Sequence, residues 1–367
     1  MKIALLGTRG IPASYSGFET CVEQLSKRLV SRGHQVTVYC RTTHSDFSEP
    51  YYLGVRLMRL PTIKNKYLDT IIHSFFSSIH SLFQGYDVCL YFIAGNSPVT
   101  WIPRIAGSKT ILNVDGLDWK REKWPWLAKK YIQCSEYLST FLPNAFLTDS
   151  RVVQSYYLER FNKNPVYIPY GSDVERKPAG ETLKKFDLEA GKYILFVGRL
   201  VPENYIHHLI NAFKNTDTNM KCVIVGDAAY ADDYKNKLYK LAETDQRIVF
   251  TGYVFGEGYY ELGSNAYIFV ETSGVGGTHP AIVEAMAFGN CVIVNDTLEN
   301  LETISDAGFS YDGKNGVSSL QHRLEILISD PDLVNEYRIK ARLRAQECFS
   351  WDAVTESYEQ LFREVIS

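Results

Sequence analysis

The sequence of 367 residues contains no apolar run long enough to cross a bilayer. A membrane-spanning helix needs about 20 consecutive apolar residues, and no stretch approaches that length. The opening stretch, residues 1–7, is too short and too soon interrupted by glycine for a signal peptide, so we expect a cytoplasmic protein. The seven cysteines form no CxxC or metal-spaced set, which argues against a zinc ribbon or disulfide scaffold and predicts reduced core residues.

The composition also lacks the biases of fibrous and disordered proteins. Hydrophobic residues make up 45% of the chain and charged residues 22%, close to globular averages. At about 150 residues per domain, this length predicts two domains. The net charge of -3 hides an imbalance, because residues 1–170 have 20 Lys and Arg against 12 Asp and Glu, whereas the rest has 19 against 30. The basic first half either contacts an anionic partner or reflects uneven surface charge.

Short β-rich runs alternate with helical patterns along the chain. The predicted strands lie at residues 2–6, 35–40, 55–60, 88–93, 110–114 and 146–148, and then at 193–197, 221–225, 247–251, 267–270 and 292–294. Such alternation is typical of βαβ units with a parallel sheet covered on both faces. Residues 163–189, with three prolines, are the predicted linker, and residues 351–365 form a last helix. We therefore expect two Rossmann-like α/β domains that bind ligands at the carboxyl ends of their strands.

A glycine-rich stretch, GTRGIPASYSGFE, follows the first strand at residues 7–19. Because it leads into a helix N-terminus, it could offer backbone N–H groups and the positive end of the helix dipole to a phosphate. Its alternative role is chain geometry alone. It does not match GxGxxG, and the second strand ends in Tyr39, Cys40 and Arg41, without the acidic residue that holds the ribose of NAD. These two absences argue against a dehydrogenase.

Two features of the second half suit a phosphorylated ligand. Arg199 comes directly after a predicted strand, where its guanidinium could hold a diphosphate oxygen or form a surface salt bridge. The stretch GVGGTHPAIVEAM at 274–286 is a glycine-rich loop that enters a helix with Pro280 near its first position. Glu284, one turn into this helix, suits ribose hydroxyls better than helix capping. His279 is either a hydrogen-bond donor to the ligand or an exposed loop residue.

Together these stretches resemble a family 4 retaining glycosyltransferase of the two-domain GT-B fold, in its rhamnosyltransferase-like branch. That branch opens with GTRGIPA followed by GGFET, and this chain has GTRGIPASYSGFET. Further matches follow in the expected order: NVDGLDWKREKW at 113–124, IPYGSD at 168–173, GRLVPEN at 198–204 and VGGTHPAIVEAMAFGNCVIVND at 275–296. The resemblance runs over essentially the whole length of the chain.

The resemblance implies a fold and a reaction. Two Rossmann-like domains with parallel sheets would face a central cleft: residues 1–170 would bind the acceptor and residues 171–350 the donor. The helix at 351–367 would pack back on the first domain. The enzyme would be a retaining, metal-independent transferase that moves a hexosyl or deoxyhexosyl unit from a UDP-glucose or dTDP-rhamnose type of donor. The acceptor would be a glycan or lipid-linked glycan of bacterial envelope polysaccharide synthesis, with no cofactor, metal or nucleic acid expected.

The resemblance also implies site residues by position. Arg199 would contact the donor diphosphate and act in catalysis, and Glu284 would accept hydrogen bonds from the ribose hydroxyls. The other implied donor-binding residues would line the diphosphate, the sugar or the base: Ser16, Gly17, Asn204, Tyr253, Val254, Gly276, Gly277, Thr278 and His279.

The chain departs from the family pattern at three places. The first of two glutamates usually separated by seven residues is missing, since Gly276 stands eight positions before Glu284 and the nearest upstream carboxylate is Glu271. Asn204 replaces the usual lysine, so one positive charge on the diphosphate is lost. The histidine of the N-terminal domain that faces the sugar is also absent. Asp115 is our candidate for contacting the sugar or the acceptor hydroxyl, and a simple turn residue is its alternative role.

Many cations of the first half gather in residues 118–130, DWKREKWPWLAKK, which combine three tryptophans with five cations. In one helix, such residues favour the headgroups of an anionic membrane. Residues 67–83 form an apolar stripe that is more typical of a core than of a membrane surface. We expect the first domain to dock peripherally on the inner face of the plasma membrane, where it would reach a polyprenyl-pyrophosphate-linked acceptor.

Two other functions stay open. A GT-B-like epimerase or hydrolase would act on the same nucleotide sugar, because one architecture supports several reactions. A non-catalytic nucleotide-sugar-binding partner would explain the missing glutamate and lysine. Against it, Arg199, the glycine-rich loops and Glu284 are all retained.

Overall fold

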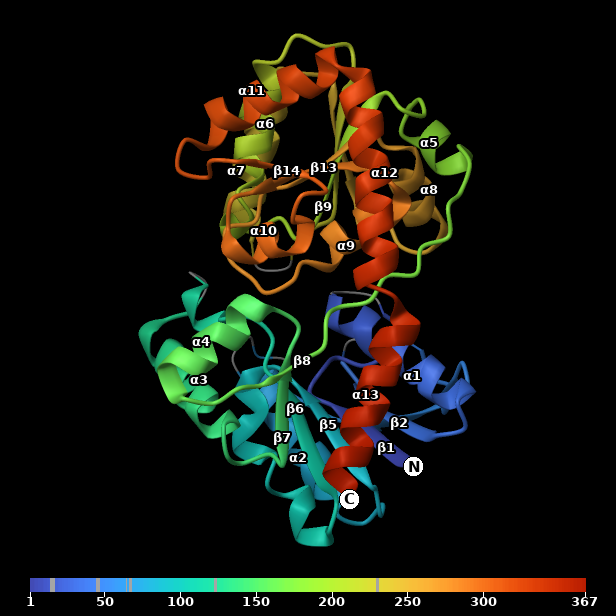
Figure 1. The fold of residues 1–367 in the computed structure, drawn as a ribbon, viewed down its shortest axis with the longest axis vertical. Helices are drawn as coiled ribbons and strands as arrows, with labels where there is room; N and C mark the ends of the chain where they lie inside the picture. The colour runs from blue at the N-terminus through green and yellow to red at the C-terminus, as the bar shows by residue number, and fades with distance from the viewer. Residues whose placement is uncertain (14–16, 44–46, 64, 66–67, 122–123, 229–230) are drawn as a thin grey trace. The chain divides into compact units, whose positions relative to one another are not determined.

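The computed structural model describes residues 1–367 except 14–16, 44–46, 64, 66–67, 122–123 and 229–230. The chain divides into two compact units, Met1–Gly171 with Trp351–Ser367, and Ser172–Ser350. Each unit contains one sheet with helices on both of its faces (Figure 1). The predicted α/β fold class, with two mainly parallel sheets, is confirmed.

The sheet of the first unit has eight strands in the described residues, and only β3 and β4 pair antiparallel. From edge to edge the order is β3 (Tyr51–Tyr52), β4 (Val55–Leu60), β2 (Gln35–Arg41), β1 (Lys2–Leu6), β5 (Val88–Phe92), β6 (Lys109–Asn113), β7 (Ala145–Thr148) and β8 (Val166–Tyr167). Leu5 of β1 pairs with Val38 on one side and with Leu90 on the other. The strand order reverses beside β1, so the carboxyl ends of β1 and β5 form a topological switch point.

The sheet of the second unit has six strands in the described residues, all parallel. Their order is β11 (Ile248–Gly252), β10 (Lys221–Val225), β9 (Tyr193–Val197), β12 (Ile268–Glu271), β13 (Cys291–Asn295) and β14 (Phe309–Tyr311). The reversal here lies between β9 and β12. Alternate side chains of β9 enter opposite core clusters, Ile194 and Phe196 in one and Tyr193 and Leu195 in the other, because successive residues of a strand face opposite sides.

Helix α13 (Trp351–Ile366) lies against α1 (Gly17–Ser31), so segments from opposite ends of the sequence cover the same face of the first sheet (Figure 1). The Trp351 ring meets Tyr170 edge-on, 5.2 Å between centroids. Glu359 is hydrogen-bonded to Arg32 at 2.7 Å and to His34 at 2.5 Å. The predicted return of the C-terminal helix to the first unit is confirmed.

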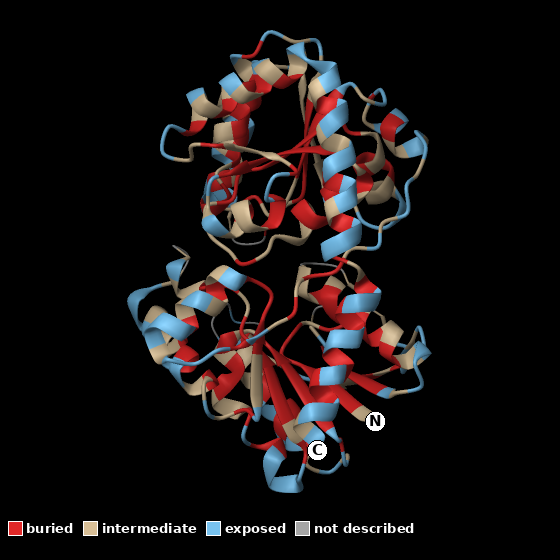
Figure 2. Cartoon of the chain, viewed as in Figure 1, coloured by how far each residue is buried: buried red, intermediate tan, exposed pale blue. Residues whose placement is uncertain are grey.

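The other helices complete the layers around the buried strands, which Figure 2 shows in red. In the first unit they are α2 (Asp69–Ser81), η1 (Ala94–Val99), η2 (Pro103–Ala106), η3 (Asp118–Lys120), α3 (Trp126–Ser139) and α4 (Arg151–Phe161). In the second unit, α6 (Ile206–Lys214), α7 (Asp232–Ala242) and α11 (Gly316–Ser329) share one core cluster. The opposite cluster includes α5 (Glu181–Lys185), α8 (Glu257–Asn265), α9 (Pro280–Phe288) and α12 (Pro331–Cys348). Two shorter elements are η4 (Pro202–Asn204) and α10 (Leu298–Ile304).

Helix α2 corrects the interpretation of the apolar stripe at 67–83. Its buried side consists of polar residues: Asp69, His73, Ser74, Ser77, Ser78 and Ser81. Three of its large apolar residues, Phe75, Phe76 and Ile79, are exposed, and Ile71 and Ile72 are partly exposed. The hydroxyls of Ser78 and Tyr91 are hydrogen-bonded at 2.7 Å, so the sheet offers this helix a polar partner. The assignment of the stripe to the core is therefore wrong.

The single helix expected over 118–130 is also wrong. Residues 118–120 form the short η3, and α3 begins only at Trp126, with Pro125 before it. Glu122 and Lys123 lie outside the described residues. In the described part of the chain, no helix is both long and apolar enough to span a bilayer.

The expectation that all cysteines are core residues holds for five of them. All seven are free thiols, but Cys134 and Cys348 are exposed. Both lie on helices, α3 and α12, whose outer sides face solvent. Apolar neighbours in the sequence therefore did not predict correctly whether these two cysteines are buried.

Candidate active site

Arg199 follows β9 at the carboxyl edge of the second sheet. Its backbone is fixed by Asn204, a buried residue whose side-chain amide donates to the Arg199 carbonyl at 2.8 Å. The Arg199 side chain is partly exposed and forms no ion pair with any residue that the structure describes. The surface salt bridge considered as its alternative is thus not formed. The guanidinium is available to an anionic ligand, whereas the predicted donor-binding residue Asn204 uses its amide on the backbone.

A buried carboxylate anchors the neighbouring loop, which connects β12 to α9. Glu271 accepts hydrogen bonds from the Ser273 backbone N–H at 3.0 Å and the Ser273 hydroxyl at 2.6 Å. Burial raises the pKa of Glu271 to about 7. The Thr272 hydroxyl donates to the Asn204 carbonyl, which links this loop to the segment after β9. Glu271 therefore fixes the loop and does not replace the missing glutamate as a ligand contact.

The loop ends at the start of α9, where Pro280 takes the first helical position as predicted. Within the described residues no side chain caps this N-terminus, and the first N–H groups of a helix have no partners inside the helix. A Cβ added to Gly276 would lie 2.7 Å from the His279 ring, so the glycine leaves room for the imidazole. Gly277 is buried, while Thr278 and His279 are partly exposed. This arrangement suits a phosphate at the helix start.

Glu284 lies one turn into α9 and is partly exposed. Desolvation of its carboxyl raises the pKa to about 7. The Tyr259 hydroxyl, from α8, donates to Glu284 Oε2 at 2.5 Å, and the Tyr259 ring packs edge-on against Phe288 at 5.9 Å. Oε1 accepts no hydrogen bond from the described residues, which leaves it for a ligand. No pattern in the sequence pointed to Tyr259, because the contact joins residues 25 positions apart.

Two aromatic rings follow β11. Tyr253 and Phe255 are both exposed, and their rings are stacked with centroids 5.6 Å apart and planes 19° apart. Such a pair can offer a stacking surface to a nucleobase. Val254, between them, packs against the core, so its side chain points away from the two rings' solvent side. Sequence reasoning missed Phe255, although its spacing of two from Tyr253 in an extended segment would place both rings on one side.

In the first unit, residues that follow the central strands β1, β5 and β6 adopt left-handed backbone angles. These are Gly7 after β1 (φ 96), Ile93 after β5 (φ 72) and Asp115 after β6 (φ 59). A β-branched residue at positive φ is a genuine outlier, and such strain clusters at functional sites. Ile93 also explains why β5 ends at Phe92, one residue earlier than predicted.

Asp115 forms a turn, because its backbone N–H donates to Asn113 Oδ1 at 3.0 Å. A turn residue was the alternative role considered for Asp115, and its side chain is partly exposed.

A second carboxylate, Asp149, lies near Asp115. Burial and the nearby carboxylates of Asp149 and Asp115 raise the pKa of the Cys21 thiol in α1, which indicates that both acids lie close to this helix. Asp149 follows β7 and was missed, although its position directly after a predicted strand is the signal that singled out Asp115.

The first glycine-rich loop is held by carboxylates of its own helix. The buried Glu19 accepts from the Arg9 backbone N–H at 3.1 Å, and Glu23 accepts from the Ala13 N–H at 2.7 Å. Gly17 is the first residue of α1, and its carbonyl accepts from the Tyr170 hydroxyl at 3.3 Å. Ser16 lies outside the described residues. Two of the amides that could have met a phosphate are therefore already used.

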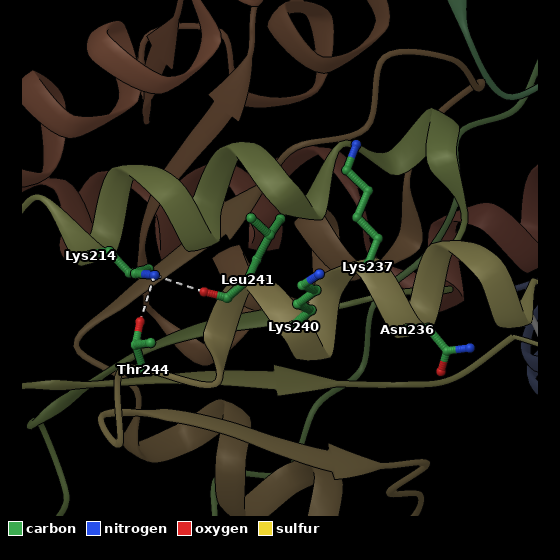
Figure 3. A pocket seen from close by; sticks show the side chains of 6 residues that line it. All are labelled: Lys214, Asn236, Lys237, Lys240, Leu241 and Thr244. Atoms are coloured by element: carbon green, nitrogen blue, oxygen red, sulfur yellow. Dashed lines mark hydrogen bonds between the residues drawn. The ribbon is translucent and has the colours of Figure 1, made fainter.

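A pocket on the second unit involves none of the predicted site residues (Figure 3). It is lined by Lys214, Asn236, Lys237, Lys240, Leu241 and Thr244. The Lys214 ammonium is bound to the Leu241 carbonyl at 2.8 Å and the Thr244 hydroxyl at 2.9 Å. Elsewhere, the described residues include no group of three or more His, Cys, Asp or Glu that could hold a metal ion.

Solved structures share this architecture. Sucrose-phosphate synthase from Thermosynechococcus elongatus matches with a TM-score of 0.84 at 20% identity, covering 99% of this chain and 98% of that chain. HepE of Anabaena in complex with UDP-glucose matches with a TM-score of 0.79 at 17% identity, covering 99% of this chain and 100% of that chain. At these identities the likeness shows the fold, which is GT-B.

Two family models match the two halves of the chain. "Glycosyltransferase Family 4" matches residues 15–176, and "Glycosyl transferases group 1" matches residues 181–344. The chain is a family 4-like glycosyltransferase of the GT-B fold. A full-length relative agrees: YtcC of Bacillus subtilis (strain 168), which carries the name of a glycosyltransferase, is 22% identical over 395 residues, spanning 100% of this chain and 93% of that protein. In this glycosyltransferase, the group 1 match includes Arg199, the loop before α9 and Glu284.

Proposed function

We propose that this glycosyltransferase is a retaining, metal-independent enzyme that transfers a hexosyl or deoxyhexosyl unit from a nucleoside-diphosphate sugar. The observation that carries the proposal is the arrangement at one sheet edge: the unpaired guanidinium of Arg199 and the uncapped start of α9 follow neighbouring strands, and Glu284 comes one turn later. The donor is of the UDP-glucose or dTDP-rhamnose type; the UDP-glucose bound to HepE and the rhamnosyltransferase-like sequence stretches support these two choices.

In the proposed mechanism, the second unit, Ser172–Ser350, holds the donor. Arg199 and the α9 N-terminus bind the diphosphate and offset its charge as the bond to the sugar breaks. Glu284 Oε1 accepts from a ribose hydroxyl, while Tyr259 holds Oε2. The Tyr253 ring, with Phe255, stacks on the base.

The predicted residues of the loop, Gly276, Gly277, Thr278 and His279, would line the diphosphate and the sugar. Gly276 and Gly277 allow close backbone approach, and Thr278 and His279 supply polar side chains that are partly exposed. Retention requires that the new glycosidic bond forms on the face from which the diphosphate leaves. The acceptor oxygen bonds to the anomeric carbon as the bond from that carbon to the diphosphate breaks, and the acceptor proton passes to an oxygen of the departing diphosphate.

The acceptor would be bound by the first unit, within Met1–Gly171. Asp115, partly exposed after β6, is proposed to contact the acceptor hydroxyl or the sugar as a hydrogen-bond acceptor. The acceptor is a glycan or a polyprenyl-pyrophosphate-linked glycan of bacterial envelope polysaccharide synthesis, reached at the inner face of the plasma membrane. The basic surplus of residues 1–170 supports an anionic, pyrophosphate-bearing acceptor.

The test is calorimetric titration of the protein with UDP, dTDP, GDP, UDP-glucose and dTDP-rhamnose in the presence of a chelator. We expect selective binding of one nucleotide and its sugar, lost in Arg199→Ala and kept in Arg342→Ala, which removes an exposed arginine of α12. The anomeric configuration of the transferred sugar, read by NMR, then tests retention. Binding that needs a divalent metal, or that survives Arg199→Ala, would contradict the proposal.

A second candidate is a nucleotide-sugar-binding protein without turnover. The observation in its favour is that Glu271 Oε1 fixes the loop and the Asn204 amide fixes the backbone, so neither residue takes the place of the missing glutamate or lysine. Donor binding without donor consumption, over a range of acceptors, would favour this candidate. Donor loss without a glycoside product would instead favour an epimerase or hydrolase.

A further inference from the structure

Helix α2 presents its apolar side to solvent. Along one side of the helix and just beyond its ends, Phe75, Phe76, Ile79 and Phe83 are 44%, 50%, 37% and 79% exposed, and Leu68 is 46% exposed. A helix that covers a sheet normally directs its apolar side toward the core. Here the opposite side faces the sheet, and it consists of His73 and four serines together with Asp69. The apolar side therefore needs another explanation than packing within the unit.

The orientation of α2 is fixed by polar contacts on its inner side. Ser78 is hydrogen-bonded to Tyr91 of β5, and the Tyr39 hydroxyl to His80 at 2.9 Å. At the N-terminal end, Asp69 Oδ2 accepts from the Arg41 guanidinium at 2.7 Å, and both side chains are buried. Rotating the helix to bury its phenylalanines would break these hydrogen bonds. It would also separate Asp69 from Arg41 and leave the Arg41 guanidinium buried without a counter-charge. The exposed apolar side is thus built into the fold.

The neighbouring element η2 extends this exposed region. It packs against α2, and its Ile105 is 69% exposed. Arg104 is also exposed, and its guanidinium donates to the Leu142 carbonyl at 2.5 Å, which holds the positive charge at the surface. We call the exposed set the α2 surface: Leu68, Phe75, Phe76, Ile79, Phe83, Arg104 and Ile105.

The sequence around the α2 surface is richer in cations than in carboxylates. Residues 51–114 contain six Lys and Arg against two Asp and Glu, of which Lys64 and Lys66 lie outside the described residues. One of these acids, Asp69, is buried against Arg41, and the other, Asp87, accepts from the backbone N–H of Lys2 at 2.7 Å. Residues 68–86 and η2 contain no further carboxylate. An apolar face that includes an exposed arginine, Arg104, and few carboxylates is complementary to an anionic bilayer, whose headgroups attract the cation while its acyl region accepts the apolar side chains.

We propose that the α2 surface is a docking site for an anionic membrane, with the phenylalanines and isoleucines of α2 and η2 inserted at the boundary between headgroups and acyl chains. The purpose of this docking rests on the proposed function, because a polyprenyl-linked acceptor lies in a bilayer. The site differs from the one expected from sequence at 118–130. A second copy of the chain is the weaker occupant, since a two-fold contact would bring two basic surfaces together.

The test uses the full chain and vesicles of phosphatidylcholine, with or without phosphatidylglycerol, in a flotation assay. We expect binding to the anionic vesicles that falls as salt is raised. Phe75→Ser with Ile79→Ser should weaken this binding by about 30-fold or more, because two buried apolar side chains are lost. Arg104→Gln should weaken it by about fivefold.

The matched control is Ile339→Ser with Leu343→Ser on α12 of the second unit. These two side chains are 55% and 50% exposed and have the same four-residue spacing. We expect the control to bind vesicles as the unmodified chain does. Equal losses in the two double variants, or no binding of the unmodified chain to anionic vesicles, would overturn the proposal.

Two more measurements separate the alternatives. Sedimentation analysis without vesicles should give the same mass for the unmodified chain and the α2 double variant; a dimer that the double variant abolishes would assign the surface to a second copy. Donor titration should be unchanged in the α2 variant, because the donor residues belong to the second unit. A chain that binds donor but not vesicles overturns only the docking site, and one that binds vesicles but no donor overturns only the proposed function.

Discussion

The two glycine-rich loops of this glycosyltransferase have the same place in the fold but different partners. Each connects a buried parallel strand to a helix, β1 to α1 and β12 to α9. In the first loop, Glu19 and Glu23 of the following helix take the backbone N–H groups of Arg9 and Ala13. In the second, the carboxylate comes from the strand, since Glu271 binds Ser273, and the start of α9 has no side-chain cap among the described residues.

The comparison shows that glycine content alone does not identify a phosphate site. What decides is which groups already use the backbone N–H donors of the loop, because a phosphate needs donors that are free and a positive local field. Two carboxylates at the first loop disfavour an anion there. The second loop keeps its carboxylate buried at the strand end, away from the helix start, and so remains suited to one.

The largest expected difference between the loops is in their tolerance of a methyl group. In the first loop, Gly10 has φ 106, and an added Cβ would lie 2.8 Å from the Cys40 backbone Cα. In the second, the three atoms nearest to a Cβ on Gly276 all belong to the His279 side chain and none to the backbone. Gly10→Ala should lower the free energy of unfolding by about 3 kcal/mol, and Gly276→Ala by less than about 1 kcal/mol. Urea unfolding measures both, and equal costs would contradict the comparison.

The next effect concerns donor affinity. Glu284→Ala should weaken donor binding by about 2 kcal/mol, or roughly 30-fold, because a hydrogen bond from the ribose to a charged group is lost. Glu19→Ala, the corresponding change in the first loop, should leave the donor Kd within about twofold while lowering thermal stability. Calorimetric titration checks both variants. If Glu19→Ala weakened donor binding as much, the first loop would also be part of the donor site.

The pH dependence of donor binding sharpens the role of the second loop. Burial raises the pKa of Glu284 to about 7, so the carboxyl is ionised above pH 7 and protonated below it. Since the ribose hydroxyls need an acceptor, affinity should fall as pH decreases, by about tenfold between pH 8 and pH 6. The ligand should be the nucleotide sugar, whose phosphates do not titrate in this range. A flat profile in Glu284→Ala is the control, and a flat profile in the unmodified chain would contradict the prediction.

The smallest expected effect is that of Tyr259→Phe. The Tyr259 hydroxyl lowers the pKa of Glu284 and holds Oε2, so its loss should weaken donor binding by about threefold and move the midpoint of the pH profile upward. Tyr260→Phe is the matched control, because both rings pack against Phe288 and Tyr259 is the one bound to Glu284. A change in affinity without a shift of the midpoint would indicate a merely structural role for Tyr259.

The order of strands and helices could be predicted because each buried strand and each amphipathic helix has its own periodic pattern. Strands β1, β4, β9 and β10 have the predicted bounds, and the other predicted strands differ by one residue at one or both ends. The short strands β3, β8 and β14 were not predicted, since two or three residues show no period. The side of α2 that faces the sheet could not be predicted either, because a pattern shows that a helix has two sides but the partner, here Tyr91, decides which one is buried.

Less of the candidate site could be predicted. Arg199 and Glu284 could be proposed from the sequence because each lies a fixed distance from a strand or helix start, which is a local relation. The contacts between Tyr259 and Glu284, and between Asn204 and Thr272, join segments far apart in the chain, so no local pattern reports them. The carboxylates that occupy the first loop are local in sequence, but only geometry shows that their oxygens reach the Arg9 and Ala13 N–H groups.

The packing of α13 against α1 sets an order of events during synthesis on the ribosome. The core of the first unit includes Trp351, Val354, Tyr358 and Phe362, so this unit lacks part of its core until α13 has been translated. The second unit, Ser172–Ser350, is complete in sequence before that. At 5–20 residues per second, translation of the intervening segment takes roughly 10–35 s. During this interval, the part of the first sheet that α13 later covers is exposed in the nascent chain. A chaperone would be needed most at this exposed face.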